Sequence, residues 1–214
     1  MRAVNLDALA NIVGGRAHQA VADEVSQKSI TLVRDPRNQV PLKLARDAQI
    51  LYLSILDSPG GWRISAPSRA FIPELKRHWR GVTSVEVSER STANELELVR
   101  AMAPRYDAIV ASVFVRAASG SGRMDLPSNM QMLLRTIARQ TEQSRKPFVA
   151  VLFGNPYTAT FLQDVPVMML TYDFYDRAER SAVNALVGDA PITGKLPITL
   201  PGVAERGAGL ERRP

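Results

Sequence analysis

Serine, carboxylate and arginine side chains are the groups with which this sequence could do chemistry, because it contains no cysteine and only two histidines. Thiolate catalysis, disulfides and cysteine-bound zinc are therefore excluded. A serine nucleophile needs a neighbouring base, but His18 and His78 both fall inside predicted helices, His18 on or near the packed side of its helix. We expect neither a serine–histidine triad nor a histidine-rich metal site.

Acidic side chains offer a second kind of chemistry. Hydrolysis of a glycosidic bond usually needs two carboxyl groups at a set separation. The carboxylates in or beside the predicted loops are Asp57, Glu89, Asp125, Asp173 and Asp176. No pair of them has a spacing that singles it out, and each is also common as a helix cap or turn residue. We therefore predict no catalytic residue, no metal site and no cofactor in this chain.

A glycine-rich loop over residues 116–123, with the sequence RAASGSGR, is the most suggestive segment. Its glycines expose backbone N–H groups, and its two arginines could hold an anion in front of a helix. The loop matches neither the G-x-G-x-x-G fingerprint nor the P-loop pattern, and its small residues could equally pack against a neighbouring surface. The candidate substrate-binding residues are Arg116, Ser119, Ser121, Arg123, Asp125 and, from the loop at 154–157, Asn155.

Strands that alternate with helices must position these loops. A short strand is predicted at 30–33, and near-continuous apolar runs predict buried strands at 48–56, 82–87, 107–115, 147–153 and 167–172. Helical patterns lie at 67–79, 92–104, 127–143, 156–162 and 176–188, after an amphipathic helix over 5–28 that is interrupted or bent at Gly14-Gly15. Strands that are apolar on both faces and joined by helices are typical of parallel sheets. We predict an α/β fold: a doubly wound, mostly parallel sheet of about six strands, helices on both faces and an extended C-terminal tail.

The 214 residues, 45% of them hydrophobic, are enough for one domain with one sizeable core. We divide it into a connector and leading helix (1–28), an α/β sandwich core (29–188) and a wrapping C-terminal tail (189–214). The tail is rich in proline and glycine and has one predicted edge strand at 198–200. In sheets of this kind ligands bind beyond the carboxyl ends of the strands, where the candidate loops fall.

The net charge of +6 would suit an anionic partner, but the basic residues are spread along the whole chain. Nucleic-acid binding needs them gathered on one face, so we expect no nucleic-acid partner. No apolar run approaches the ~18 residues of a membrane span, and residues 1–15 do not read as a signal peptide. We expect a soluble protein without a membrane partner. Its compartment stays open, since any signal peptide would lie upstream of this fragment.

Four stretches carry a resemblance to a known family: 29–35 with 41–42, 114–127, 151–157 and 188–201. The last reads GDAPITGKLPITLP and is similar to the ending G-(K/R)-L-P-(V/I)-(T/S)-(L/I)-P of that family, at the expected place after the last helix. With the other three in order, the whole chain resembles the C-terminal domain, the second one, of bacterial family 3 glycoside hydrolases.

The resemblance implies an α/β sandwich that follows a barrel domain carrying the aspartate nucleophile. That barrel is missing from these 214 residues, so the chain alone should be inactive. In the β-glucosidase branch, a loop of this domain supplies an acidic residue to the active site. Here Ser119-Gly120-Ser121 stands in that loop, so the sequence resembles more closely the β-N-acetylglucosaminidase-like branch, whose acid/base is a histidine on the barrel.

Two hypotheses follow. In the first, the chain is a non-catalytic domain that packs on the barrel of a β-N-acetylhexosaminidase-like enzyme and shapes the carbohydrate cleft at the interface, with 116–123 as contact loop. A face that fits a barrel would bury ~600–1,500 Å², so self-association of the chain alone is also expected. In the second, it is a stand-alone binding module for an anionic sugar or nucleotide, held in the crevice at the strand carboxyl ends.

Overall fold

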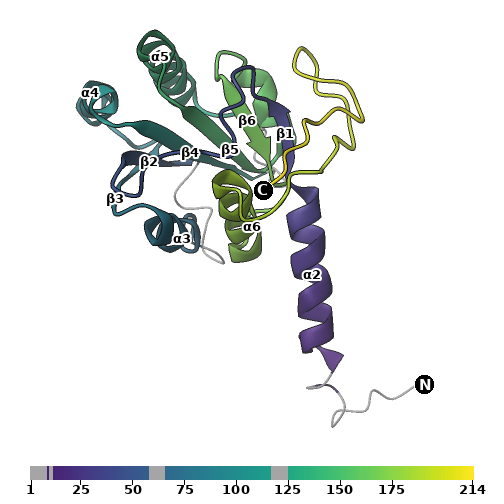
Figure 1. The fold of residues 1–214 in the computed structure, drawn as a ribbon. Coiled ribbons are helices and arrows are strands. Elements are labelled where there is room, and N and C mark those ends of the chain that lie inside the picture. Colours follow the sequence, from purple (N-terminus) through teal and green to yellow (C-terminus); the bar gives the residue numbers. More distant parts are fainter. Residues whose placement is uncertain (1–8, 10–11, 58–65, 117–124) are drawn as a thin grey trace.

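A computed structural model describes residues 9, 12–57, 66–116 and 125–214 of the chain (Figure 1). At its centre lies a six-stranded sheet with the order β1-β6-β5-β4-β2-β3. Every neighbouring pair is parallel except β1 with β6. The strands are β1 (Thr31–Arg34), β2 (Gln49–Leu56), β3 (Gly81–Ser88), β4 (Ala108–Val115), β5 (Phe148–Gly154) and β6 (Val167–Leu170). The predicted doubly wound, mostly parallel sheet is confirmed.

Helices cover both faces of this sheet, as Figure 1 shows. On one face α4 (Ala93–Met102) and α5 (Ser128–Ser144) pack their apolar side chains against the strands. On the other face α3 (Phe71–His78) and α6 (Asp176–Val187) do the same. Because the central strands are covered on both sides, all eight residues of β4 are buried.

The N-terminus of α4 shows how the sequence begins a helix. Thr92 and Glu95 form a capping box: Thr92 Oγ1 accepts from Glu95 N at 3.3 Å, and Glu95 Oε2 accepts from Thr92 N at 2.7 Å. The two side chains together satisfy N–H groups that the first turn leaves without helical partners. The helix predicted at 92–104 therefore begins as expected, and it continues into a 3₁₀ turn, η2 (Ala103–Arg105).

The predicted burial of the strand at 82–87 was wrong. In β3 only Val87 and Ser88 are buried, and Ser84 and Glu86 are exposed. The reason is that β3 is an edge strand, which pairs with β2 alone.

Two further elements differ from expectation. Residues 156–162 form a 3₁₀ helix, η3 (Pro156–Phe161), in place of an α-helix. The strand expected to reach 172 ends at Leu170, because Tyr172 has a φ of 62° and thus lies in the left-handed region.

The C-terminal tail does not form the strand predicted at 198–200, where Leu200 makes an isolated bridge with Ala204. Instead, the end of the chain lies along β1. Leu210 N donates to Leu32 O at 2.8 Å, and Arg212 and Ile192 exchange two backbone hydrogen bonds of 3.0 Å. The tail thus covers backbone groups of a strand at the margin of the sheet.

The leading helix, α2 (Arg16–Ser29), begins after Gly14, whose φ is 72°, so the predicted interruption lies where expected. It contacts α6 through polar groups: Ser26 Oγ lies 2.9 Å from Ser181 Oγ, and Arg177 Nε donates to Asp23 at 2.5 Å. The expected packing of His18 was wrong, because α2 buries no residue and His18 is exposed. Within the described part of the chain, no helix has the length and apolar character needed to cross a membrane.

Candidate functional site at the carboxyl edge of the sheet

The carboxyl ends of β2 and β4 are tied together by Asp57. Its backbone N donates to Phe114 O at 3.0 Å, and its carboxylate accepts from Arg116 N at 2.9 Å. These two bonds fix the point at which the chain leaves β4 and enters the glycine-rich loop. Asp57 therefore anchors the backbone of Arg116 at the end of β4.

The next strand along this edge, β5, ends in a tight contact with β4. Gly154 has a φ of 80°, and a Cβ placed on it would lie 2.8 Å from the carbonyl oxygen of Val115. Asn155 follows, 7% exposed: its N donates to Val115 O at 3.1 Å, and its Oδ1 accepts from Tyr157 N at 3.1 Å. Asn155 thus holds the start of η3 against the end of β4.

At the end of β6, residues 171–173 form a sharp turn. Thr171 is buried and its hydroxyl donates to Asp173 O at 2.6 Å, and Tyr172 donates to Thr31 Oγ1 at 2.9 Å. Asp173 accepts from Phe174 N at 2.7 Å, as a turn carboxylate does. These contacts connect the carboxyl edge with the beginning of β1.

The six candidate binding residues fall into two groups. The structure brings Arg116 and Asn155 together, since both adjoin Val115 at the end of β4. Asp125 is half-buried and lies shortly before α5. Ser119, Ser121 and Arg123 lie outside the described residues, so their part in a site stays a prediction.

Near this edge lies a buried polar cluster that sequence reasoning missed. The carboxylate of Glu179, on α6, is fully buried and accepts from three backbone N–H groups, those of Ser68 (2.8 Å), Ala70 (2.7 Å) and Phe71 (2.8 Å). Burial raises the pKa of Glu179 above that of a free carboxyl, although the three N–H groups oppose this. Glu179 therefore caps the start of α3 from a different helix.

The cluster extends to β2 through Ser68. This residue has a φ of 66°, and hydrogen bonds of 2.7 Å join its hydroxyl to the side chains of Tyr52 and Ser54. The segment that leads into α3 is thereby hydrogen-bonded both to β2, through Tyr52 and Ser54, and to α6, through Glu179. One signal could have revealed Glu179: it stands four residues before Val183 and seven before Leu186, on the buried face of α6.

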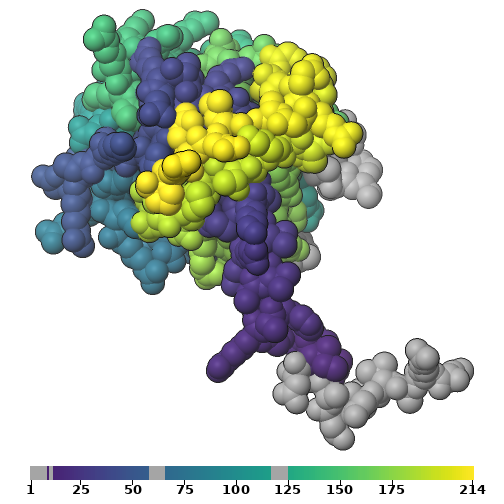
Figure 2. Space-filling model, turned by 45° about the vertical axis from the view of Figure 1, so that its right-hand side comes forward, coloured from purple at the N-terminus to yellow at the C-terminus, as the bar shows by residue number. Residues whose placement is uncertain are grey.

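Beside the turn at 171–173 a groove of about 580 Å³ runs along α2. Its walls include His18, Val21 and Val25 on α2, and Tyr172 and Asp173 on the edge of the sheet. Val21 and Val25 are 59% and 62% exposed. Figure 2 shows that α2 projects from the body of the molecule.

Metal-ligating side chains do not gather at this edge or elsewhere in the described ranges: there, no three His, Asp or Glu residues are placed to share an ion. The described part of the edge thus consists of the anchored backbone at Asp57, Arg116 and Asn155 and the apolar groove beside α2.

No protein-family model and no curated protein sequence matches this chain, whereas solved structures do. A fungal multi-domain GH3 β-N-acetylglucosaminidase, which has a GCN5-related glucosamine N-acetyltransferase region, superposes with a TM-score of 0.71 at 19% identity over 97% of this chain. A GH3 β-N-acetylglucosaminidase from Paenibacillus sp. str. FPU-7 matches over 94% (TM-score 0.67, 17% identity). A β-glucosidase from Listeria innocua, in complex with gluconolactone, matches over 92% (TM-score 0.68, 20% identity).

These matches concern a part of each neighbour. The chain spans 21%, 36% and 28% of the three solved chains, respectively. In fold, it fits the C-terminal domain of a family 3 glycoside hydrolase, as its sequence motifs predicted.

Proposed function

We propose that this chain is the non-catalytic α/β domain of a β-N-acetylhexosaminidase-like family 3 glycoside hydrolase. It packs its carboxyl edge and α2 against a barrel domain, on the same or a separate chain, and shapes the carbohydrate cleft between them. The nucleophile belongs to the barrel. The observation that carries the proposal is that nearly the whole chain superposes on only 21–36% of three much longer glycosidase chains.

The surface of α2 supports a missing partner on this side. Its polar residues contact α6, while Val21 and Val25 face outward, as do Ile12 and Val13 just before the helix. An amphipathic helix normally turns its apolar stripe toward its own core. Here the stripe has no cover within the described residues, and contiguous exposed apolar surface is typical of interaction sites.

Two exposed aromatic side chains lie at the carboxyl edge of the sheet. Tyr157, at the start of η3, is 40% exposed, and Tyr175, just before α6, is 45% exposed. Aromatic residues are enriched in the centres of protein interfaces and supply much of the binding energy there. Exposed aromatic side chains at the carboxyl edge are what a docked barrel, with sugar bound at the boundary, would need.

An activity assay with an aryl β-N-acetylglucosaminide tests the proposal. We expect no turnover by this chain alone, and turnover that rises when a barrel-domain polypeptide of the same enzyme class is added and the two associate. Turnover by the chain alone would refute the non-catalytic role. Failure of every cognate barrel to bind would refute the docking role.

A matched pair of variants locates the interface. Val21→Asp places a carboxylate in the groove. Ala20→Asp places the same group outside it, because Ala20 is exposed, does not line the groove and lies about 100° around the helix from Val21. We expect the first substitution to weaken association with the barrel at least roughly tenfold and the second to leave it unchanged. The apolar stripe is not the interface if both variants bind equally well. Sedimentation of the chain alone will show whether this face also drives self-association.

A further inference from the structure

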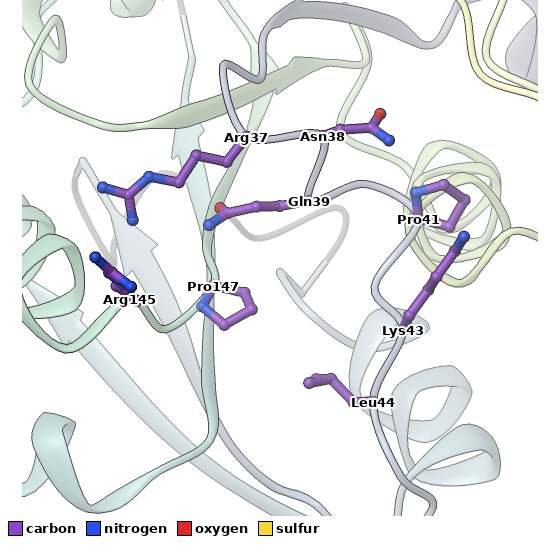
Figure 3. Close-up of a pocket in the computed structure, with 8 residues that line it drawn as sticks. All are labelled: Arg37, Asn38, Gln39, Pro41, Lys43, Leu44, Arg145 and Pro147. Carbon is purple, nitrogen blue, oxygen red and sulfur yellow. The ribbon is translucent and has the colours of Figure 1, made fainter.

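A second hollow lies at the opposite, amino edge of the sheet, and nothing in the proposed function uses it. Its volume is about 610 Å³, within the range of ligand-binding pockets. Its two walls are the segment between β1 and β2 and the turn between α5 and β5 (Figure 3). The lining residues are Arg37, Asn38, Gln39, Pro41, Lys43, Leu44, Arg145 and Pro147.

The lining is cationic and carries no carboxylate. Among the described residues, Lys43 and Arg145 form no ion pair, and Arg37 has a loose one with Glu142 at 3.6 Å. Arginine stays protonated at any pH of interest, so two guanidinium groups on one hollow repel each other until an anion lies between them. Their planar donors suit phosphate oxygens in particular.

Figure 3 shows how the side chains are aimed. Arg37 and Gln39 extend from one wall toward Arg145 and Pro147 on the other, and Leu44 points into the middle. Lys43 is directed away from the two arginines. It therefore adds positive charge to the hollow without reaching the space between the two guanidinium groups. The Oε1 of Gln39 is buried and has no hydrogen-bond partner in the described structure. A buried polar atom of this kind normally has one.

The first wall is held rigidly. The buried Asp35 carboxylate accepts from Gln39 N (2.7 Å) and Val40 N (3.1 Å), and Arg212 neutralises it at 2.9 Å. Leu42 N donates to the carbonyl of Leu186 on α6 at 2.8 Å. Arg37 and Gln39 are thus presented by a backbone that needs no reordering on binding, which favours affinity.

The second wall is equally fixed. Arg145 ends α5 with a φ of 57°, and its N donates to Glu142 O at 3.2 Å. The ammonium of the next residue, Lys146, donates to the carbonyl oxygens of Pro104 and Tyr106, both at 2.7 Å. Of these two neighbouring cations, one therefore anchors the turn and the other, Arg145, faces the hollow.

From this geometry we infer a binding site for a small oligophosphate or phosphate ester, held between Arg37 and Arg145. The buried Oε1 of Gln39 is an acceptor, so it would take a hydroxyl group of the ligand and not a phosphate oxygen. Pro41, Leu44 and Pro147 supply apolar surface on which a ring of the ligand can lie. The site is independent of the glycosidase proposal, because it shares no residue with the carboxyl edge.

Titration of the full chain with inorganic tripolyphosphate, followed by backbone amide NMR, tests the inference. We expect saturable shifts at 37–44 and 145–147 with a midpoint below about 1 mM at low salt, and a melting temperature that rises with ligand. Adenosine should give no shifts. ATP binding more tightly than tripolyphosphate would assign the apolar surface to a nucleoside, and equal affinity would assign the site to the phosphate chain alone.

Variants decide whether the site is specific. Arg145→Asn removes the guanidinium while asparagine still accepts the left-handed backbone, and Arg37→Gln removes the other. Each should weaken binding about tenfold. The control is Arg206→Asn on the C-terminal tail, which is exposed and distant in sequence from both walls. The inference fails if shifts do not saturate, or if the control weakens binding as much as the other two, since diffuse charge would then explain it.

Discussion

Removal of the Glu179 carboxylate should destabilise this protein more than any other single carboxylate change discussed here. Glu179→Ala leaves three N–H groups without an acceptor, those of Ser68, Ala70 and Phe71. Each buried unsatisfied donor costs roughly 1–3 kcal/mol, so the free energy of unfolding should fall by about 3–5 kcal/mol even if water repairs part of the damage. A domain has only about 5–15 kcal/mol in total.

Urea unfolding followed by circular dichroism measures this loss. Glu179→Gln keeps one acceptor oxygen: placed at Oε2 it still serves Ala70 and Phe71, so this variant should lose about 1–3 kcal/mol. Glu86→Ala, exposed on the edge strand, should stay within about 0.5 kcal/mol of the wild type. The reasoning is refuted if Glu179→Ala loses less than about 1 kcal/mol, or if it is no worse than Glu179→Gln.

Three further predictions rest on single contacts. Because burial raises the pKa of Glu179 in the folded state, the folded protein binds this proton more tightly than the unfolded chain does. The difference in unfolding free energy between wild type and Glu179→Gln should therefore shrink as pH rises through that pKa. A difference that grows with pH would contradict the direction of the pKa shift. Thr92→Ala removes the cap of α4 and should lower stability by about 1 kcal/mol in urea unfolding. Gly154→Ala should lower the melting temperature more than Gly207→Ala, because both have positive φ but only Gly154 would clash with Val115.

Periodicity predicted most of the fold, because strands covered on both faces and amphipathic helices leave a local signal. The position of a strand within the sheet leaves a weaker signal in the sequence. Residues 82–87 read as apolar, yet Ser84 and Glu86 already mark one face as polar. Whether such a strand is central or at the edge depends on which strands pair with it, and pairing is decided by contacts far apart in sequence.

The same limit explains the site. Parallel strands end at one edge of a sheet, and this predicted that the loops of Asp57, Arg116 and Asn155 meet there. That a ligand binds at these loops stays a prediction. The sequence could not show that the side chains of Asp57 and Asn155 accept hydrogen bonds from backbone N–H groups. A carboxylate or amide at a strand end looks the same in sequence whether it faces a ligand or an N–H group. The capping of α3 by Glu179 joins residues 108 to 111 positions apart, beyond any local pattern.

The two proposed binding surfaces lie at opposite ends of the strands, and this separation has a consequence. β2 has eight residues, so roughly 25 Å of strand lies between the edges at about 3.3 Å per residue. The partner-facing groove uses Val21, Val25 and the turn after β6, whereas the cationic hollow uses Arg37 and Arg145. A phosphate ligand should therefore bind equally well with the barrel docked or absent. If docking changed that affinity, the sheet between the two edges would have to adopt two arrangements, which its fully buried central strand β4 disfavours.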